Sequence, residues 1–316
     1  MRLSKAIEGF LLEITAAGYN PNTISNYRFY LRLLTEQIGD IPIEAIKSEH
    51  LVAFMAWLQT KYTPRKRQHL APASIDNAWK GIRSFFRWAH NTLGVPRPDL
   101  HLPRPRYEAP EIQPFTEEEI RALLKATEYT REARGKRRKG YVQRRPTALR
   151  DKAILLLLLD TGIRSGEFCR LRVQDVDLET GAVFIRAFRS GRKTKSRFVY
   201  LGRKARRALW RYLASRGNPL PEEPLFLTNE MRPFSQAVLR HLLRRLGERA
   251  GVPNVYPHRF RHTFAIQYLR NGGDVFTLQR LLGHSSLDMV RRYLHIVRSD
   301  LETAHRTASP VDRWRL

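Results

Sequence analysis

Six prolines between residues 96 and 114 divide this chain of 316 residues into two parts. Proline fixes the backbone angle φ and has no N–H group, so a segment this rich in proline is expected to be an extended linker. A chain of this length can form two domains, each with its own core. The sequence therefore predicts one domain over residues 1–105, ending in the proline-rich linker, and a second over residues 106–316.

Apolar residues recur at helical spacing through residues 5–95, and we find no strand pattern there. One helix is expected to follow a cap at Asn22 or Thr23, because both side chains can accept a hydrogen bond from the first turn. Others are expected near residues 48–58 and after Ser74. The first part is therefore predicted to be a small helical domain.

The second part is predicted to contain helices and one β-hairpin. Thr116 and Glu119 form a capping box for its first helix, and a buried helix over residues 153–159 is expected to end near Gly162. Residues 181–201 have the alternation of a hairpin around a basic tip. Helices then follow over residues 204–215, 235–250, 257–271, 276–282 and 287–298. The predicted fold class is mainly α, with an α+β second domain that carries a small antiparallel hairpin.

The charge of the chain indicates a polyanionic partner. Lys and Arg number 57 against 30 acidic residues, which gives a net charge of +27. Residues 1–95 carry 12 basic and 7 acidic side chains, so +22 falls on the rest of the chain. Nucleic acid is the natural candidate, because neutralising phosphates releases counterions. A membrane partner is disfavoured, since no apolar stretch approaches twenty residues.

Metal and disulfide chemistry are not indicated. Cys169 is the only cysteine, which excludes an intramolecular disulfide and suits a cytoplasmic protein. There is no phosphate-binding glycine loop and no zinc-protease motif, and we expect neither a metal nor a cofactor. Eight histidines show no ligand spacing and are expected to be structural or exposed: His50, His69, His90, His101, His241, His262, His295 and His305.

A different set of residues suits attack on a DNA phosphodiester. Arg164 follows a turn at Gly162, and His258 and Arg261 share one face of an expected helix at spacing i,i+3. His284 and Tyr293 come later in the chain. Arginine forks match the nonbridging oxygens of a phosphate that gains charge in the transition state. A tyrosine near its ordinary pKa of ~10 needs a proton acceptor and a positive field to act as nucleophile.

In this order and at these spacings the set resembles the tyrosine recombinases of the phage integrase family, over nearly the whole chain. Residues 1–105 resemble that family's SAM-like core-binding domain, on the segments 22–27 and 83–88. The resemblance implies a 3′-phosphotyrosyl intermediate formed without metal or ATP. It implies His258 as proton acceptor, His284 as a phosphate contact, and Glu167 as the residue that holds a neighbouring site side chain. The implied catalytic residues are Arg164, Lys193, His258, Arg261, His284 and Tyr293.

The family lysine that protonates the leaving 5′-oxygen lies in the hairpin loop. One alignment of the loop places Arg192 at that position, but a guanidinium is a poor proton donor. We therefore expect Lys193, with Lys195 as the alternative. The basic residues of this hairpin, Arg189, Arg192 and Arg197, are expected to contact DNA. Ser165-Gly166 departs from the family pattern, which has an apolar residue followed by serine between the arginine and the glutamate.

The resemblance further implies a homotetramer on two paired inverted-repeat DNA sites, in which the residues after Tyr293, through Leu316, dock on a neighbouring subunit and accessory proteins can take part. The short N-terminal region is more Xer-like than that of larger phage integrases, and a cytoplasmic, nucleoid-associated enzyme is expected. A type IB topoisomerase and a catalytically dead DNA-binding accessory protein remain as alternatives. The basic insertion at residues 131–145 is read either as a solvated loop or as a DNA contact.

Overall fold

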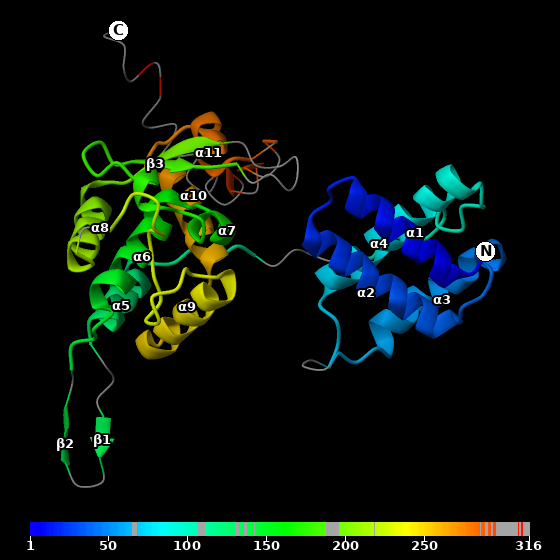
Figure 1. Ribbon diagram of the computed structural model, residues 1–316, viewed down its shortest axis with the longest axis horizontal. Coiled ribbons are helices and arrows are strands. Elements are labelled where there is room, and N and C mark those ends of the chain that lie inside the picture. The colour runs from blue at the N-terminus through cyan, green and yellow to red at the C-terminus, as the bar shows by residue number, and fades with distance from the viewer. Residues whose placement is uncertain are drawn as a thin grey trace. The chain divides into compact units, whose positions relative to one another are not determined.

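The computed structural model describes most of the chain, in two compact units (Figure 1). The first unit runs to Glu111 and the second begins at Ile112. The described residues are 1–64, 68–106, 111–129, 133–135, 138–141, 143–187, 196–217, 219–284, 286–287, 290–291, 293–294, 309 and 311, with backbone only at 133–135 and 138–141. Each unit has its own hydrophobic core, as expected for a domain.

The first unit is helical, as predicted. It contains α1 (Leu3–Ala16), α2 (Pro21–Ile38), the short 3₁₀ helix η1 (Ile43–Ala45), α3 (Ser48–Thr60) and α4 (Pro72–Leu93). The cap of α2 differs from the expected one: Asn20 accepts a hydrogen bond from the N–H of Asn22 at 2.9 Å. Pro21 then occupies the first helical position, where its fixed φ is favourable. Asn22 and Thr23 therefore lie within the first turn.

Aromatic side chains form the centre of the first unit. Phe10, Phe54, Phe85 and Phe86 are each at most 1% exposed. The ring of Phe10 lies 5.6 Å from that of Phe85 and 5.5 Å from that of Trp88. These contacts fasten α1 to α4, because aromatic pairs at this distance stabilise beyond their buried area.

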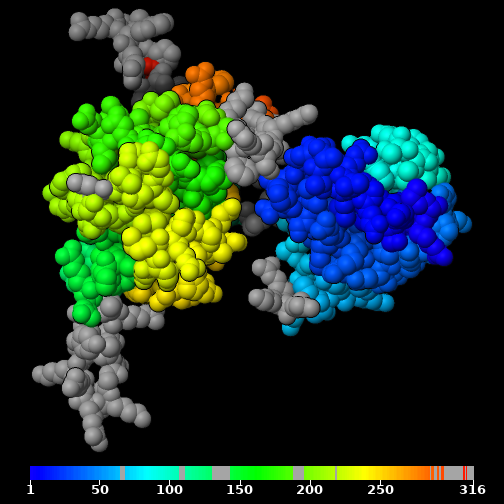
Figure 2. All heavy atoms as spheres, viewed as in Figure 1, coloured from blue at the N-terminus to red at the C-terminus, as the bar shows by residue number. Residues whose placement is uncertain are grey.

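The second unit is built around α6 (Ala148–Thr161). Helices α5 (Glu117–Glu128), α8 (Arg203–Ser215) and α10 (Pro257–Arg270) pack against it, and α9 (Gln236–Ala250) packs against α5. Thr116 caps α5 through the expected capping box with Glu119. In Figure 2, α8 and α9 (yellow-green to yellow) form much of the visible surface of this unit. The remaining elements are α7 (Ser165–Phe168), the 3₁₀ helix η2 (Val173–Asp175) and α11 (Val275–Leu282).

The predicted hairpin is present, and the fold class is confirmed. Strands β3 (Ala182–Ile185) and β4 (Arg197–Tyr200) pair antiparallel, from Ala182 with Tyr200 to Ile185 with Arg197. A second antiparallel pair, β1 (Ala133–Gly135) and β2 (Arg138–Tyr141), lies inside the basic insertion. The sequence did not predict this pairing, because only three of the seven strand residues are basic, two are glycine, and the segment lacks the apolar alternation by which a strand is recognised. None of the helices among the described residues has the length and apolarity needed to cross a membrane.

Candidate active site

Gly162 directs the chain from α6 to Arg164. Its φ of +59° ends α6 in the left-handed conformation that favours glycine. A Cβ at this position would lie 2.5 Å from the ring of Phe264, so a side chain has no room. Two residues later, Arg164 occupies the N-cap position of α7 and is partly exposed, at 31%. The turn therefore presents this guanidinium at the end of a buried helix.

Glu167 holds two arginines in place. It accepts hydrogen bonds from the backbone N–H of Arg164 at 2.8 Å and from its Nη1 at 3.1 Å. It also accepts from both terminal nitrogens of Arg197, each at 2.9 Å. Burial alone would raise the pKa of Glu167, but the hydrogen bonds and charges of Arg197 and Arg164 outweigh it and lower the pKa to about 2. The carboxylate is therefore ionised, and its hydrogen bonds orient Arg164.

Arg197 occupies a different place from the DNA contact expected for it. Its side chain is only 9% exposed, and its Nε donates to the carbonyl of Leu281 at 2.6 Å. The guanidinium also packs on Gly283, where a Cβ would lie 3.0–3.2 Å from its atoms. All three nitrogens of the group are used within the protein, so Arg197 joins β4 to α7 and α11.

Arg261 and His284 form the interior of the cluster. Arg261 is 3% exposed and donates to the carbonyls of Gly162 at 2.8 Å and Leu282 at 2.7 Å. Its Nη2 also lies 2.7 Å from Nε2 of His284. Burial and then the charge of Arg164 lower the pKa of Arg261 to about 9. Since the guanidinium nitrogen is a donor, Nε2 of His284 is the acceptor in this pair.

The tautomer of His284 leaves its second ring nitrogen able to donate a hydrogen bond. Burial, followed by the charges of Arg261, Arg164 and Arg197, lowers the pKa of His284 to about 3, so the ring is neutral. With Nε2 accepting from Arg261, the ring proton is on Nδ1. This buried nitrogen makes no hydrogen bond to any described residue. The site thus offers an N–H group beside two arginines, an arrangement suited to an anionic oxygen.

Tyr293 is buried and bonded to a histidine that the sequence did not single out. Its side chain is 4% exposed, and its hydroxyl lies 2.9 Å from Nδ1 of His262. The expectation that His262 is structural or exposed therefore misses a contact to the candidate nucleophile. A phenolate at Tyr293 would also be close enough to Arg261 to favour the charged guanidinium. The available signal was the position of His262, directly after Arg261 on α10.

His258 lies one helical turn before His262 and is exposed at its surface. The two imidazole rings are 6.2 Å apart, and no hydrogen bond joins His258 to a described residue. Partial burial, followed by the charges of Arg261 and Arg164, lowers the pKa of His258. His258 therefore borders the arginine cluster, whereas His262 is the histidine that touches the tyrosine.

The structure brings Arg164, Glu167, Arg261 and His284 into one bonded cluster, with Tyr293 beside it across α10. Arg164 completes the cluster by donating from Nη2 to the carbonyl of Gly283 at 3.0 Å. Four predicted residues, Arg189, Arg192, Lys193 and Lys195, lie outside the described residues. So does most of the proposed docking segment after Tyr293, of which only Leu294, Ser309 and Val311 are described.

Family models match both units. The model described as "Phage integrase family" matches residues 113–299, and "Phage integrase, N-terminal SAM-like domain" matches residues 7–93. Tyrosine recombinase XerC of Oceanobacillus iheyensis is 29% identical over 92% of this chain and 91% of its own. XerC of Staphylococcus saprophyticus is 32% identical over 77% of each chain. XerA of Thermococcus kodakarensis is 28% identical over 98% of this chain and 97% of its own.

Solved structures agree. The crystal structure of XerA recombinase covers 97% of this chain and 99% of its own, with 26% identity and a TM-score of 0.51. The Tn1549 transposon integrase in complex with a circular intermediate DNA covers 96% and 99%, with a TM-score of 0.74; at 18% identity it supports the fold alone. With family models matched in both units and the arginine–histidine–tyrosine cluster assembled, the chain belongs to the phage integrase family and is a Xer-like tyrosine recombinase.

Proposed function

We propose that this site-specific recombinase cleaves and rejoins duplex DNA with Tyr293 as the nucleophile. The observation that carries the proposal is the buried Tyr293 hydroxyl, hydrogen-bonded to His262 and close to the Arg261 cluster. Such a hydroxyl has both a proton acceptor and the positive field that a weak nucleophile requires. Attack on a phosphodiester forms a 3′-phosphotyrosyl bond and breaks the bond to the 5′-oxygen.

Arg164, Arg261 and His284 are proposed to bind the scissile phosphate. Arg261 is held by two backbone carbonyls and His284, so its charge is already oriented before DNA arrives. Arg164 is part-exposed and can turn its fork to the nonbridging oxygens, with Glu167 fixing its backbone. The Nδ1–H of His284 donates a further bond. These groups stabilise the charge that develops on the phosphate in the transition state.

His262 is proposed to accept the proton of Tyr293 during attack. Its Nδ1 faces the hydroxyl at 2.9 Å, which is within the range required for a general base. His258, the acceptor that the resemblance implies, makes no such bond. Its place beside Arg261 suits contact with the DNA backbone. The leaving 5′-oxygen needs a proton in turn, and Lys193 is the proposed donor, with Lys195 as the alternative.

Strand exchange follows from the chemistry of the intermediate. The phosphotyrosyl bond retains the energy of the broken phosphodiester, so a second 5′-hydroxyl can attack it without ATP or a metal. We propose that four subunits act on two paired inverted-repeat sites, with the segment after Tyr293 docking on a neighbour. Related proteins support the DNA part of this proposal. XerH has been solved bound to its difH substrate, and a lambda integrase dimer bound to a COC′ core site.

The experiment is covalent trapping on fragmented genomic DNA from the source organism, beside Tyr293→Phe. Adducts are captured under denaturing conditions and the attached DNA ends are sequenced. Recurring inverted-repeat sites that are absent with Tyr293→Phe are expected. Adducts scattered over all sequences would favour a topoisomerase. Tight binding without adducts would favour an accessory protein that has lost catalysis, and adducts with Tyr293→Phe would refute the nucleophile.

A further inference from the structure

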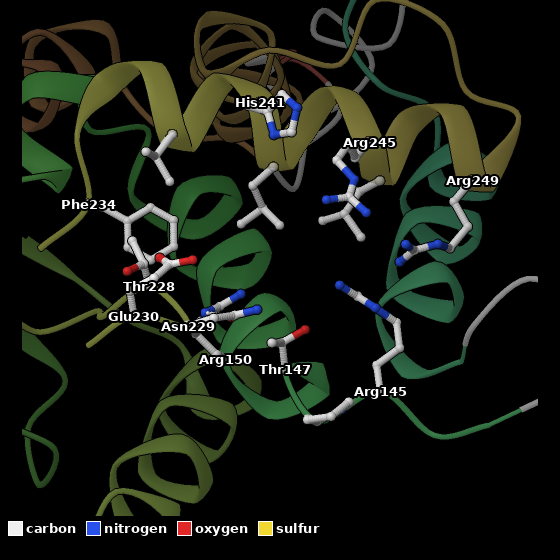
Figure 3. Close-up of a pocket in the computed structure, with 14 residues that line it drawn as sticks. Arg145, Thr147, Arg150, Thr228, Asn229, Glu230, Phe234, His241, Arg245 and Arg249 are labelled. Atoms are coloured by element: carbon white, nitrogen blue, oxygen red, sulfur yellow. Dashed lines mark hydrogen bonds between the residues drawn. The ribbon is translucent and has the colours of Figure 1, made fainter. Parts of the chain in front are cut away.

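One pocket of the second unit is basic, and several of its arginines are bonded within the protein. It measures about 640 Å³ and lies between α9 and the start of α6 (Figure 3). Arg145 and Arg150 both pair with the buried carboxylate of Asp151, at 2.8 and 2.9 Å. Across the pocket, Arg249 donates to the carbonyl of Ala126. These arginines therefore serve the fold.

A second groove, between α5, α6 and α8, carries cations that are not compensated. It measures about 380 Å³, and its charged lining is a single acid, Glu128, with five cations: Arg144, Lys152, Lys204, Arg207 and Arg211. Glu128 is already paired with Lys152 at 2.8 Å. Lys204, Arg207 and Arg211 are exposed and make no hydrogen bond or ion pair with any described residue. We call these three residues the α8 basic face.

The α8 basic face works against the stability of its own helix. The sequence of α8 contains no acidic residue, and cations in its first turn meet the positive end of the helix dipole. Lys204 and Arg207, like Arg207 and Arg211, stand three and four residues apart, where like charges repel. The buried side of the helix does not require them, because its packing comes from Ala205, Ala208, Leu209, Tyr212 and Leu213. A polyanion in the groove would offset this repulsion.

The groove is separate from the catalytic cluster. Lys152, its polar residue on α6, lies nine residues before the end of that helix, a rise of roughly 14 Å. Figure 1 shows α8 and α10 on either side of α6. The basic insertion at residues 131–145, with eight Lys or Arg, joins α5 to α6 beside the groove. Of the insertion, the described residue Arg144 lines the groove together with the cations of α8.

We propose that the α8 basic face binds the phosphate backbone of a second segment of duplex DNA, in addition to the duplex at Tyr293. Cations distributed along one helix face, with Arg144 beside them, suit a linear polyanion better than a single acidic side chain. Arginine forks and a lysine ammonium are both phosphate ligands. The surface is separate from the catalytic site, so the proposal does not depend on which residues carry out strand cleavage.

The test compares two double variants of the full chain. Arg207→Gln with Arg211→Gln removes two cations of the α8 basic face. Arg121→Gln with Arg244→Gln is the control, since each of these exposed arginines pairs with an acid four residues away in its own helix. Binding is measured against salt concentration on a short duplex that covers one site and on a duplex several times as long.

On the long duplex, we expect the variant Arg207→Gln with Arg211→Gln to bind with a weaker dependence on salt. The magnitude of the slope of log K against log salt should fall by about 1.8, because each of the two lost phosphate contacts contributes about 0.9. The short duplex and the control variant are expected to keep their slopes. An unchanged slope on the long duplex would overturn the proposal and would favour an acidic protein as the binding partner of the α8 basic face. Equal losses on both duplexes would also overturn it, because they would place the face on the first DNA segment. Covalent capture of the short duplex by Tyr293 reports separately on catalysis.

Discussion

Replacement of His262 tests the assignment of the proton acceptor. His262→Ala removes the group that faces the Tyr293 hydroxyl at 2.9 Å and leaves the arginine cluster intact. A positioned general base contributes about 10²–10⁴-fold to rate, so the activation barrier should rise by about 3–5 kcal/mol. The lost hydrogen bond to Tyr293, a residue that is 4% exposed, should also lower the free energy of unfolding by about 1 kcal/mol.

The assay is the single-turnover rate of covalent complex formation on a nicked duplex that prevents religation. His262→Gln separates the two effects, because an amide can hydrogen-bond to the hydroxyl but cannot take its proton. We expect His262→Gln to recover stability and to remain slow. DNA affinity should change little in either variant. If His262→Ala reacts within a few-fold of the unmodified protein while His258→Ala is slowed at least 10²-fold, the acceptor is His258 and the reasoning from geometry fails.

Two further predictions concern the frame of the site. Gly162→Ala should lower the free energy of unfolding by more than Gly251→Ala, because both glycines have positive φ but only at Gly162 would a Cβ meet another side chain, at 2.5 Å from Phe264. The strain alone costs about 1–3 kcal/mol, and equal losses in thermal melts would remove the steric argument. The pKa of His284 is about 3 in the folded protein against 6.5 ordinarily, so the unfolded chain binds this proton more readily and stability should fall as pH drops from 6.5 towards 3. His284→Gln should flatten that part of the stability–pH curve, and an unchanged curve would contradict the shift.

The sequence predicted the helices and most of the cluster because local rules place them. The Thr116 box is a helix start, and Gly162 and Gly283 are helix ends that a glycine marks. The spacing typical of the family then identified Arg164 and His284, which follow these glycines. The end residues of some helices differ from the predicted ones, as at the cap of α2, which is Asn20 and not Asn22 or Thr23.

The remaining features depend on contacts between distant segments. Arg197 is basic and borders a hairpin tip, so its sequence suggests DNA, but its partner Glu167 lies thirty residues earlier. His262 meets Tyr293 from thirty-one residues away, and no periodicity in α10 distinguishes that contact from an exposed position. Strands β1 and β2 lack the alternation by which strands are recognised. Tertiary packing decided the cases of Arg197 and His262, whereas β1 and β2 pair with each other within one short segment.

The position of Arg261 has a consequence for motion in the site. Its guanidinium joins the carbonyl ends of two helices, through Gly162 after α6 and Leu282 at the end of α11. Parting these ends would strand a buried charge without its acceptors, at a cost of several kcal/mol. These two hydrogen bonds therefore hold the helix ends together. We therefore expect Arg261 to stay in place when DNA binds, whereas Arg164, which is partly exposed, can turn towards the phosphate.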